Sequence, residues 1–491
     1  MTQSASTYRR RSTSVIDGRE TTVAYLGGGS RQWAPTVVQD MALSELGGVV
    51  RLYDADLESA RRNARFGNWV REHHADDGAA TGDWRYEAVD GLEAALAGAD
   101  AVVLSTQYDP AETFVHDLDI PEAYGIYGAV SATIGPGGIL RAMRTIPVYR
   151  AFAAAIREHC PDAWAFNFTN PVHFVTRALY DEYPGINAVG LCHEVLGTRS
   201  HLASMAEEAF GIEADRRDVT VNVKGINHFT WVDEARCRGR DLWPVLEETA
   251  GTERANRTFT PEELEDVSPF VDNWQVSWEL FRRFGLLPAA GDRHIVEYAP
   301  WFLDDRERLN RWGVKRTDSD YRAKHWTPAE SDQTTDVEAW MDGDREFELD
   351  SSGEVFADVL EALAGGEPFV TNLNLPNAGQ VEGIEHGTVV ETNALVRAGE
   401  VRALSAGGFP RPVRAIVSGH VETIETLIEA ARTGDVDAAF RAFVLDQQVR
   451  RLDPDDARDL FAELIGAQAD YLDGWALEDA SVLAASPAYP G

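Results

Sequence analysis

A strand, a glycine-rich turn and a helix follow one another near the start of the chain, and this order constrains the fold more than any other feature. Residues 22–26 form a short apolar run, residues 27–30 read Gly-Gly-Gly-Ser, and a helical pattern follows at about residues 35–46. A second apolar run comes next, at residues 49–53. A strand–helix–strand series of this kind predicts a parallel sheet that is covered by helices on both faces.

The alternation continues well past the first hundred residues. Further strands are expected at residues 101–105, 163–168 and 187–191, and further helices at residues 56–74, 147–159 and 172–183. Apolar and polar residues then alternate strictly at residues 219–223. This change of period predicts half-exposed strands in an antiparallel arrangement.

From about residue 260 onward the pattern predicts a mostly helical unit. Thr260 is a good helix N-cap because Pro261 follows it at the first helical position and Glu263 closes a capping box. A late helix pair is expected at residues 435–461, and the charged stretch at residues 317–352 indicates a long surface insertion.

These patterns together predict an α/β protein with a Rossmann-like, doubly wound parallel sheet and a second α+β, largely helical domain. We assign residues 21–195 to an NAD-binding domain and residues 196–491 to a domain for substrate, metal and oligomer contacts. Residues 1–20 are polar and are expected to form a disordered leader.

The charge balance limits the classes of partner. The chain of 491 residues carries 45 basic and 81 acidic residues, a formal net charge of −36. Nucleic acids and anionic membrane surfaces would be repelled, so we expect neither as a partner. An acidic, lysine-poor surface suits a protein kept soluble in concentrated salt, although acidic drift in a mesophile gives the same composition.

Cysteine usage indicates a reducing compartment. The chain has only Cys160, Cys192 and Cys237, which is an odd and sparse count that provides no disulfide framework. The leader lacks the apolar core of a signal peptide, and no apolar run approaches the roughly 18 residues that span a bilayer. We therefore expect a soluble, cytoplasmic protein.

The glycine-rich turn predicts a dinucleotide site. Gly27 and Gly29 allow the backbone to approach a pyrophosphate, and Ser30 precedes a helix whose N-terminus favours negative charge. Asp54, at the end of the second strand, is placed to bind a ribose, which favours NAD over its phosphorylated form. Gln32 replaces the third glycine of the usual fingerprint, so a tight turn in an unrelated α/β protein is the alternative.

Two asparagines follow the strand that is expected at residues 163–168. Asn167 and Asn170 lie where parallel strands present their carboxyl ends, at which ligands bind. Their amides suit a nicotinamide ribose or sugar hydroxyls. An Asx-turn ahead of Pro171 is the alternative, and both roles can coexist.

Cys192 and His228 are candidate metal ligands. Cys192 and His193 end the next strand, and His228 lies in an apolar stretch. A thiolate and a neutral imidazole suit a borderline divalent ion and leave room for substrate oxygens. Each residue has a simpler alternative, because a buried cysteine is often an inert hydrophobe and a lone histidine is often a core residue.

Taken together, these segments resemble glycoside hydrolase family 4, the NAD- and metal-dependent glycosidases. The resemblance runs from about residue 21 to residue 301 and thins afterwards. Its parts are residues 27–30, Gly-Pro-Gly-Gly at 135–138, Arg-Thr-Ile-Pro at 144–147, Asn-Pro at 170–171, Cys-His at 192–193, Asn-His at 227–228 and His-Ile-Val-Glu-Tyr at 294–298. The resemblance implies that Cys192 and His228 bind a metal, usually Mn²⁺.

The same resemblance implies an unusual mechanism. NAD would take a hydride from C3 of the sugar, and the resulting ketone would acidify the proton on C2. The metal would stabilise the enediolate as a Lewis acid. A base would remove the C2 proton, the aglycone would leave from C1, water would add, and the hydride would return. Such enzymes are exceptions to the two-carboxylate scheme of glycosidases.

The residues after Cys192 indicate the subfamily. His193, Glu194 and Val195 are similar to members that act on unphosphorylated α-glycosides. Residues 226–231 and 291–294 resemble the α-galacturonidase branch, which places His294, with Asn170, among the expected substrate contacts. The fork of Arg293 suits a uronate carboxylate. A surface ion pair is the alternative role for this arginine.

The chain also departs from the family pattern. Gly-Gln-Glu-Thr of the family is replaced by Val-Ser-Ala-Thr at residues 130–133, which puts one substrate contact in doubt. The catalytic base of relatives, Tyr or Asp, has no clear counterpart. We assign it to Asp272, whose alternative is an N-cap or surface carboxylate, and we assign the acid role to His193.

The sequence therefore predicts an α-glycosidase for α-linked galacturonic acid that uses NAD and Mn²⁺, with a uronic acid oligosaccharide as substrate, and forms a homodimer or homotetramer. An α-glucosidase, α-galactosidase or α-glucuronidase of the same family is the first alternative. A plain NAD-dependent dehydrogenase and a non-catalytic NAD-binding sensor are alternatives of other classes.

Overall fold

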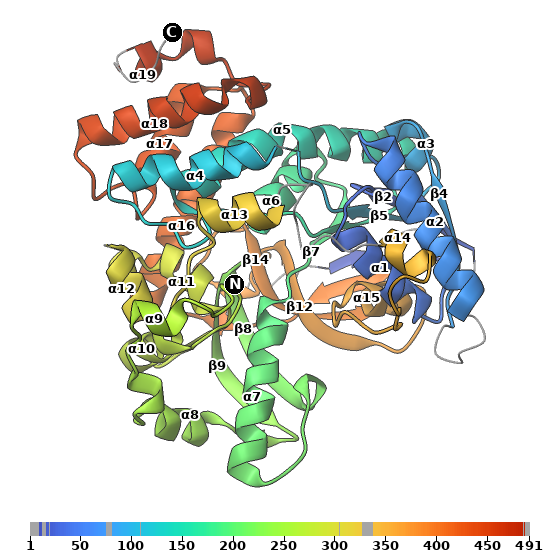
Figure 1. Ribbon diagram of the computed structural model, residues 1–491, viewed down its shortest axis with the longest axis horizontal. Helices are drawn as coiled ribbons and strands as arrows, with labels where there is room; N and C mark the ends of the chain where they lie inside the picture. The colour runs from blue at the N-terminus through green and yellow to red at the C-terminus, as the bar shows by residue number, and fades with distance from the viewer. Residues whose placement is uncertain are drawn as a thin grey trace, which may run out of the picture.

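A computed structural model describes residues 9–11, 16–18, 20–74, 81–108, 110–303, 305–326, 337–484 and 486. Within these ranges the backbone forms one sheet of 14 strands (Figure 1). Its main order is β10-β9-β8-β14-β12-β7-β6-β5-β2-β3-β4, in which the edge strand β10 comprises Arg240–Asp241. Six of these strands are parallel: β2 (Thr21–Leu26), β3 (Gly47–Tyr53), β4 (Asp83–Ala88), β5 (Ala101–Leu104), β6 (Trp164–Asn167) and β7 (Asn187–Gly190). The order reverses at β2, as in a doubly wound fold.

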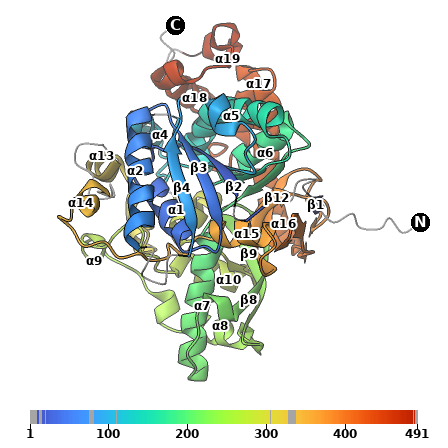
Figure 2. The same cartoon turned by 90° about the vertical axis from the view of Figure 1, so that its right-hand side faces the viewer.

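Helices cover both faces of the parallel strands. The helices α1 (Trp33–Ala42) and α2 (Leu57–His74) pack together beside β3 and β4, as Figure 2 shows. The opposite layer consists of α3 (Leu92–Leu96), α5 (Gly135–His159) and α6 (Val172–Glu182). This arrangement confirms the predicted Rossmann-like sheet.

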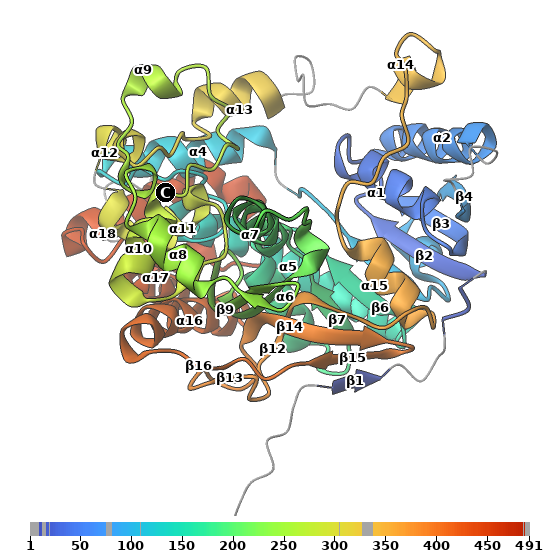
Figure 3. The ribbon, with the colours of Figure 1, turned by 90° about the horizontal axis from the view of Figure 1, so that it is seen from below.

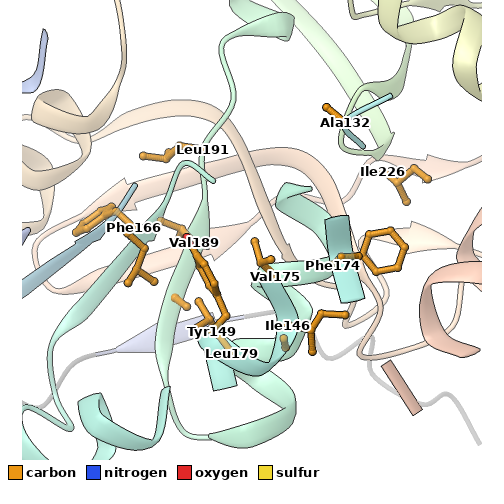
Figure 4. Close-up of a cluster of buried hydrophobic side chains, with 14 of the residues drawn as sticks. Ala132, Ile146, Tyr149, Phe166, Phe174, Val175, Leu179, Val189, Leu191 and Ile226 are labelled. Atoms are coloured by element: carbon orange, nitrogen blue, oxygen red, sulfur yellow. The ribbon is translucent and has the colours of Figure 1, made fainter. Parts of the chain in front are cut away.

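Part of the hydrophobic core lies between this second helical layer and the sheet. Figure 4 shows Tyr149 of α5 and Leu179 of α6 beside Phe166 of β6 and Val189 of β7, all of them buried. The four residues of β6 and the four of β7 are all buried, which is why both strands are continuously apolar in sequence.

An antiparallel half extends the same sheet. The strands β8 (Val219–Ile226) and β9 (Phe229–Cys237) pair antiparallel, which confirms the prediction from the alternation at residues 219–223. The strand β12 (Phe369–Pro376) lies between β7 and β14 (Val389–Arg397), and β14 in turn pairs with β8.

The part of the chain after residue 260 is therefore less helical than its sequence pattern predicted. It does contain long helices, namely α16 (Arg411–Ala431), α17 (Val436–Leu445) and α18 (Pro454–Gln468), which pack near α5 and α4 (Ala111–Ala123) in Figure 1. It also supplies β12 and β14, because pairing on both edges outweighs the weak local preference of those segments.

The helix expected at residues 147–159 begins twelve residues earlier, at Gly135, and Pro147 lies inside it. A proline removes the N–H that would bond the carbonyl four residues before it. That carbonyl belongs to Met143, and it accepts a hydrogen bond of 2.8 Å from the indole N–H of Trp475. A partner distant in sequence therefore compensates for Pro147, and α5 continues.

Part of the expected leader is ordered. The strand β1 (Arg9–Arg11) pairs antiparallel with β15 (Glu400–Ala403), as Figure 3 shows, and Ile16 is buried. Most of the other residues in the range 1–20 lie outside the described part of the chain. The division at residue 195 stays a prediction.

The expected insertion at residues 317–352 does not lie entirely on the surface. Residues 327–336 fall outside the described ranges, but α13 (Ser319–Trp326) carries the buried Arg322. After α14 (Val337–Met341), Phe347 packs against Phe66 of α2 with ring centroids 5.6 Å apart. Among the described helices, none combines the length and apolar character that a bilayer span requires.

Candidate active site

A cavity of about 430 Å³ lies at the start of α7 (Glu194–Phe210) and beside α11 (Asp292–Tyr298). Four of its lining residues are His193, Glu194, Asp272 and Arg293. The structure thus brings together three residues that the sequence singled out from separate segments, and it adds Glu194. Because α7 follows β7, the cavity lies at the carboxyl end of the parallel strands, where α/β proteins bind ligands.

Glu194 is the central acidic group of this site. Its Oε2 accepts a hydrogen bond of 2.6 Å from the backbone N–H of Gly291, and its Oε1 lies 3.3 Å from Nε2 of His294. Burial opposes ionisation of the carboxyl, but the neighbouring imidazoles, His294 first, outweigh it and hold the pKa of Glu194 well below its usual range. Glu194 is therefore a carboxylate at neutral pH.

Glu194, His228 and His294 form a group that can hold a metal ion. One ligand atom from each residue lies within 4.8 Å of the others. The two imidazole centroids are 4.0 Å apart, and neither Nδ1 has a hydrogen-bond partner among the described residues. Burial is the main reason why the pKa values of both histidines are lowered, which favours the neutral form that can coordinate a metal ion. One carboxylate and two imidazoles suit a borderline divalent ion.

The predicted ligands His228 and Cys192 reach this region from different strands. His228 occupies the tight turn between β8 and β9 with a φ of 63°, and Cys192 lies two residues beyond the end of β7. Cys192 is outside the group of three ligands described above. Burial and then the charges of Glu391 and Glu194 raise the pKa of its thiol well above the usual value. A bound cation would have to displace that proton.

Asp272 lies next to Glu194 across Gly291. A Cβ atom on Gly291 would lie 3.4 Å from Oδ2 of Asp272 and 3.4 Å from Oε2 of Glu194. Asp272 accepts a hydrogen bond of 3.0 Å from the backbone N–H of Trp274. Burial, followed by the charge of Asp292, raises the pKa of Asp272 well above its usual range. A carboxyl with a raised pKa in a cavity is a candidate for proton transfer.

His193 is oriented by a residue that the sequence did not indicate. Its Nδ1 lies 3.1 Å from Oε1 of Glu354, and its Nε2 lies 3.7 Å from Oε1 of Glu194. The contact with Glu354 is the main cause of a raised pKa for His193. The imidazole is therefore suited to donate a proton into the cavity.

Arg293 stacks on an aromatic ring at the cavity. Its guanidinium carbon lies 4.4 Å from the ring centroid of Phe270. Burial lowers its pKa, although the charges of Glu194, Glu297 and Asp272 oppose this shift. Among the described residues no carboxylate forms a salt bridge with Arg293. This placement disfavours the alternative of a surface ion pair.

The glycine-rich turn has the geometry expected of a dinucleotide site. The backbone N–H of Gly29 donates a hydrogen bond of 2.9 Å to Oδ2 of Asp54. Gly27 has a φ of 93°, and a Cβ there would lie 2.0 Å from the carbonyl oxygen of Ser105. Ser30 accepts a 3.0 Å hydrogen bond from the N–H of Trp33, at the start of α1. The turn and Asp54 are thus held together, and the ribose-binding role of Asp54 stays a prediction.

Trp33 connects this turn to the cavity. Its ring centroid lies 6.5 Å from that of His193 and 5.8 Å from that of Phe168. A dinucleotide bound at the turn would therefore extend toward the residues that line the cavity.

The two asparagines differ in their environment. Asn167 is fully buried, its Oδ1 accepts a hydrogen bond of 3.0 Å from the N–H of Thr169, and its Nδ2 donates one of 3.1 Å to Thr176. These bonds favour the Asx-turn role that the sequence also allowed. The buried Oδ1 of Asn170 has no hydrogen-bond partner among the described residues, so it is available to a ligand.

Comparison with known proteins identifies the family. Residues 22–208 match the family 4 glycosyl hydrolases, and residues 223–449 match the family 4 glycosyl hydrolase C-terminal domain. The chain belongs to this family.

Individual relatives cover almost the whole chain. The alpha-galacturonidase of Thermoanaerobacter italicus is 38% identical over 461 residues, which span 92% of this chain and 97% of that protein. A solved Bacillus subtilis structure, described as a glucosidase, has a TM-score of 0.83 and 36% identity, and covers 91% of this chain and 100% of its own. A 6-phospho-alpha-glucosidase from gut microorganisms, solved with NAD and Mn²⁺, shares the fold with a TM-score of 0.73 at 19% identity, over 92% of this chain and 99% of that one.

Proposed function

We propose that this family 4 glycosidase is an α-galacturonidase that depends on NAD and a divalent ion such as Mn²⁺. The observation that carries the proposal is the stacked guanidinium of Arg293, which forms no salt bridge with a carboxylate of the described residues and lines a cavity with His193, Glu194 and Asp272. Its side chain is partly buried, and a substrate carboxylate that accepts two hydrogen bonds from the guanidinium would offset the cost of that burial. The identity of 38% to an alpha-galacturonidase supports the same substrate.

The residues present fit both cofactors. Gly27, Gly29, Ser30 and Asp54 would hold the dinucleotide at the N-terminus of α1. His228 and Cys192 would hold the ion, and Glu194 and His294 would complete its surroundings. When bound, NAD supplies reversible hydride transfer at the sugar, and the ion supplies positive charge beside an oxygen that becomes anionic.

The chain's own residues supply the proton transfers and the orientation. Arg293 binds the C5 carboxylate and fixes the ring, and Asn170 binds a sugar hydroxyl. Asp272 accepts the proton from C2, a task for which a pKa above the usual carboxyl range is favourable. His193, oriented by Glu354, donates a proton to the oxygen of the leaving sugar.

The natural substrate that fits this arrangement is a short oligosaccharide of α-linked galacturonic acid. The three free cysteines, Cys160, Cys192 and Cys237, support a reducing, cytoplasmic location. A homodimer or homotetramer remains our proposal for the assembly, and light scattering on the purified protein tests it.

A substrate panel tests the function. Hydrolysis of p-nitrophenyl α-glycosides and of galacturonate dimers is measured with and without Mn²⁺, NAD and a reductant. We expect hydrolysis of galacturonides only when both cofactors are present. Activity restricted to α-glucosides or α-galactosides would replace the proposed substrate, and no activity on any α-sugar would reject the proposal.

A further inference from the structure

A single row of residues crosses the four strands that join the two halves of the site. Gly190 of β7 pairs with Asn374 of β12, Asn374 pairs with Glu391 of β14, and Glu391 pairs with Gly225 of β8. Figure 1 shows these strands side by side. Gly190 precedes Cys192 by two residues, and Gly225 precedes His228 by three. The row therefore connects the segments that carry the two proposed metal ligands.

Glu391 is a buried carboxyl group surrounded by asparagine amides. It is 1% exposed. Its Oε1 accepts a hydrogen bond of 2.6 Å from Nδ2 of Asn372, and its Oε2 accepts one of 3.2 Å from Nδ2 of Asn227. Burial raises the pKa of Glu391 to about 7, and the amides of Asn372, Asn227 and Asn374 oppose this shift by favouring the ionised form. One oxygen thus accepts from a donor on β12, and the other accepts from a donor in the turn between β8 and β9.

The two hydrogen-bonded asparagines lead directly to the proposed metal ligands. Asn227 immediately precedes His228, and its amide also faces the sulfur of Cys192. Nδ2 of Asn372 also donates a hydrogen bond of 3.4 Å to the carbonyl oxygen of Cys192. Glu391 therefore contacts the loop after β7 through Asn372 and the turn between β8 and β9 through Asn227.

A buried acidic residue at this junction is difficult to explain by stability alone. Replacement of a buried polar network by apolar residues of similar volume is often neutral or stabilising. A carboxylate, however, accepts from two amides at once and fixes the direction of both, which an apolar side chain does not do.

We propose that Glu391 is a positioning residue that, through Asn372 and Asn227, sets the separation and orientation of Cys192 and His228 for a divalent cation. This inference rests on the proposed function, because it takes these two residues as ligands. Groups that orient ligands in this way typically contribute 10- to 100-fold to metal affinity.

The test measures the affinity of the purified, full-length protein for Mn²⁺ by electron paramagnetic resonance of the free ion. Glu391→Gln should weaken Mn²⁺ binding about 10- to 100-fold, because the amide of glutamine accepts from one asparagine but opposes the second with another donor. NAD affinity, measured separately, should be unchanged. Glu400→Gln is the matched control: Glu400 is 2% exposed on β15 and pairs with Arg397 at 2.7 Å, and its change should leave Mn²⁺ affinity unaltered.

A reciprocal exchange makes the test specific. In the double variant Glu391→Gln, Asn372→Asp, the new carboxylate accepts from the glutamine amide, and the glutamine oxygen again accepts from Asn227, but residue 372 no longer donates to the carbonyl oxygen of Cys192. We expect the double variant to bind Mn²⁺ more tightly than Glu391→Gln, because the bond to Asn227 is restored, and more weakly than the unmodified protein, because the bond to Cys192 is lost. A double variant that binds Mn²⁺ no more tightly than Glu391→Gln would overturn the proposal. If the single variant does not fold, the folded double variant still decides: an Mn²⁺ affinity equal to that of the unmodified protein would overturn the proposal.

The test distinguishes a failure of this inference from a failure of the proposed function. Equal Mn²⁺ affinities of the unmodified protein and Glu391→Gln would overturn the role of Glu391 and leave the proposed function intact. An unmodified protein that binds no Mn²⁺ would contradict the metal assignment of the proposed function and the inference with it.

Discussion

Oε1 of Glu194 lies 3.3 Å from Nε2 of His294, although the two residues are 100 positions apart in the sequence. This contact connects the first residue of α7 to α11 and places a carboxyl group beside the imidazoles of His294 and His228. The metal site therefore extends beyond Cys192 and His228, and the contact motivates the first prediction.

Glu194→Gln should weaken Mn²⁺ binding at least tenfold, because it removes the anionic ligand of the group while keeping its shape. Isothermal titration with Mn²⁺ measures the change. Glu208→Gln on the same helix is the control, since Glu208 has a side-chain exposure of 77% and is paired with Arg254 at 3.5 Å. Equal Mn²⁺ affinity in Glu194→Gln and the unmodified protein would remove Glu194 from the site.

Arg293→Met should lower kcat/KM for an α-galacturonide by about 10- to 100-fold, the effect of losing a charged hydrogen-bond pair of about 1.5–3 kcal/mol. Residual activity on the uncharged α-galactoside should change far less. The control is Arg257→Met, because Arg257 stacks on Phe259 at a similar 4.3 Å but does not line the cavity. Equal losses on both sugars would mean that Arg293 does not recognise the carboxylate.

Gly29→Ala should weaken NAD binding by at least about tenfold, or 1.4 kcal/mol. A Cβ at this position would lie 2.7 Å from Cγ of Asp54 and would displace the carboxylate that is expected to bind the ribose. Fluorescence titration with NAD measures the loss. Gly419→Ala in α16 is the control, because the nearest atom to a Cβ there is 3.6 Å away. Unchanged NAD affinity of Gly29→Ala would place the dinucleotide elsewhere.

His173→Leu should alter how stability depends on pH. Burial lowers the pKa of His173 to about 3, whereas an unfolded histidine titrates near pH 6.5. Below about pH 6.5 the unfolded chain therefore binds a proton that the folded chain does not, and the free energy of unfolding falls as the pH falls. Without this histidine, the loss between pH 7.5 and pH 5 should be smaller by about 2 kcal/mol.

Urea unfolding across that pH range measures the effect, and the same substitution at the exposed His386 is its control. A constant difference in unfolding free energy between His173→Leu and the unmodified protein at all these pH values would contradict a neutral, buried His173.

The sequence revealed those parts of the molecule that depend on neighbours along the chain. The turn at residues 27–30 and Asp54 could be predicted because β2, α1 and β3 follow one another directly. The start of α5 could not be predicted in this way. Pro147 leaves the carbonyl of Met143 without its usual helical donor, and the donor that replaces it, Trp475, lies 332 positions further along the chain.

The site also contains some residues that local sequence motifs reveal and others that they do not. Cys192, His193 and His228 stand in recognisable motifs, and Glu194 could have been found from its place directly after Cys192 and His193. Glu354 and Glu391 carry no local signal. Their roles arise only when segments that are distant in sequence come together in the folded sheet.

The central claim is that the protein cleaves α-linked galacturonate through removal of the C2 proton. The most direct test is proton NMR of the galacturonate released from its dimer in D₂O, with NAD and Mn²⁺ present. We predict that galacturonate appears only with both cofactors and that deuterium occupies C2 in about half of it, because the unit from the non-reducing end exchanges its C2 proton and the leaving unit keeps its own. Release of galacturonate in which both units retain the C2 proton, or release without the cofactors, would contradict the account.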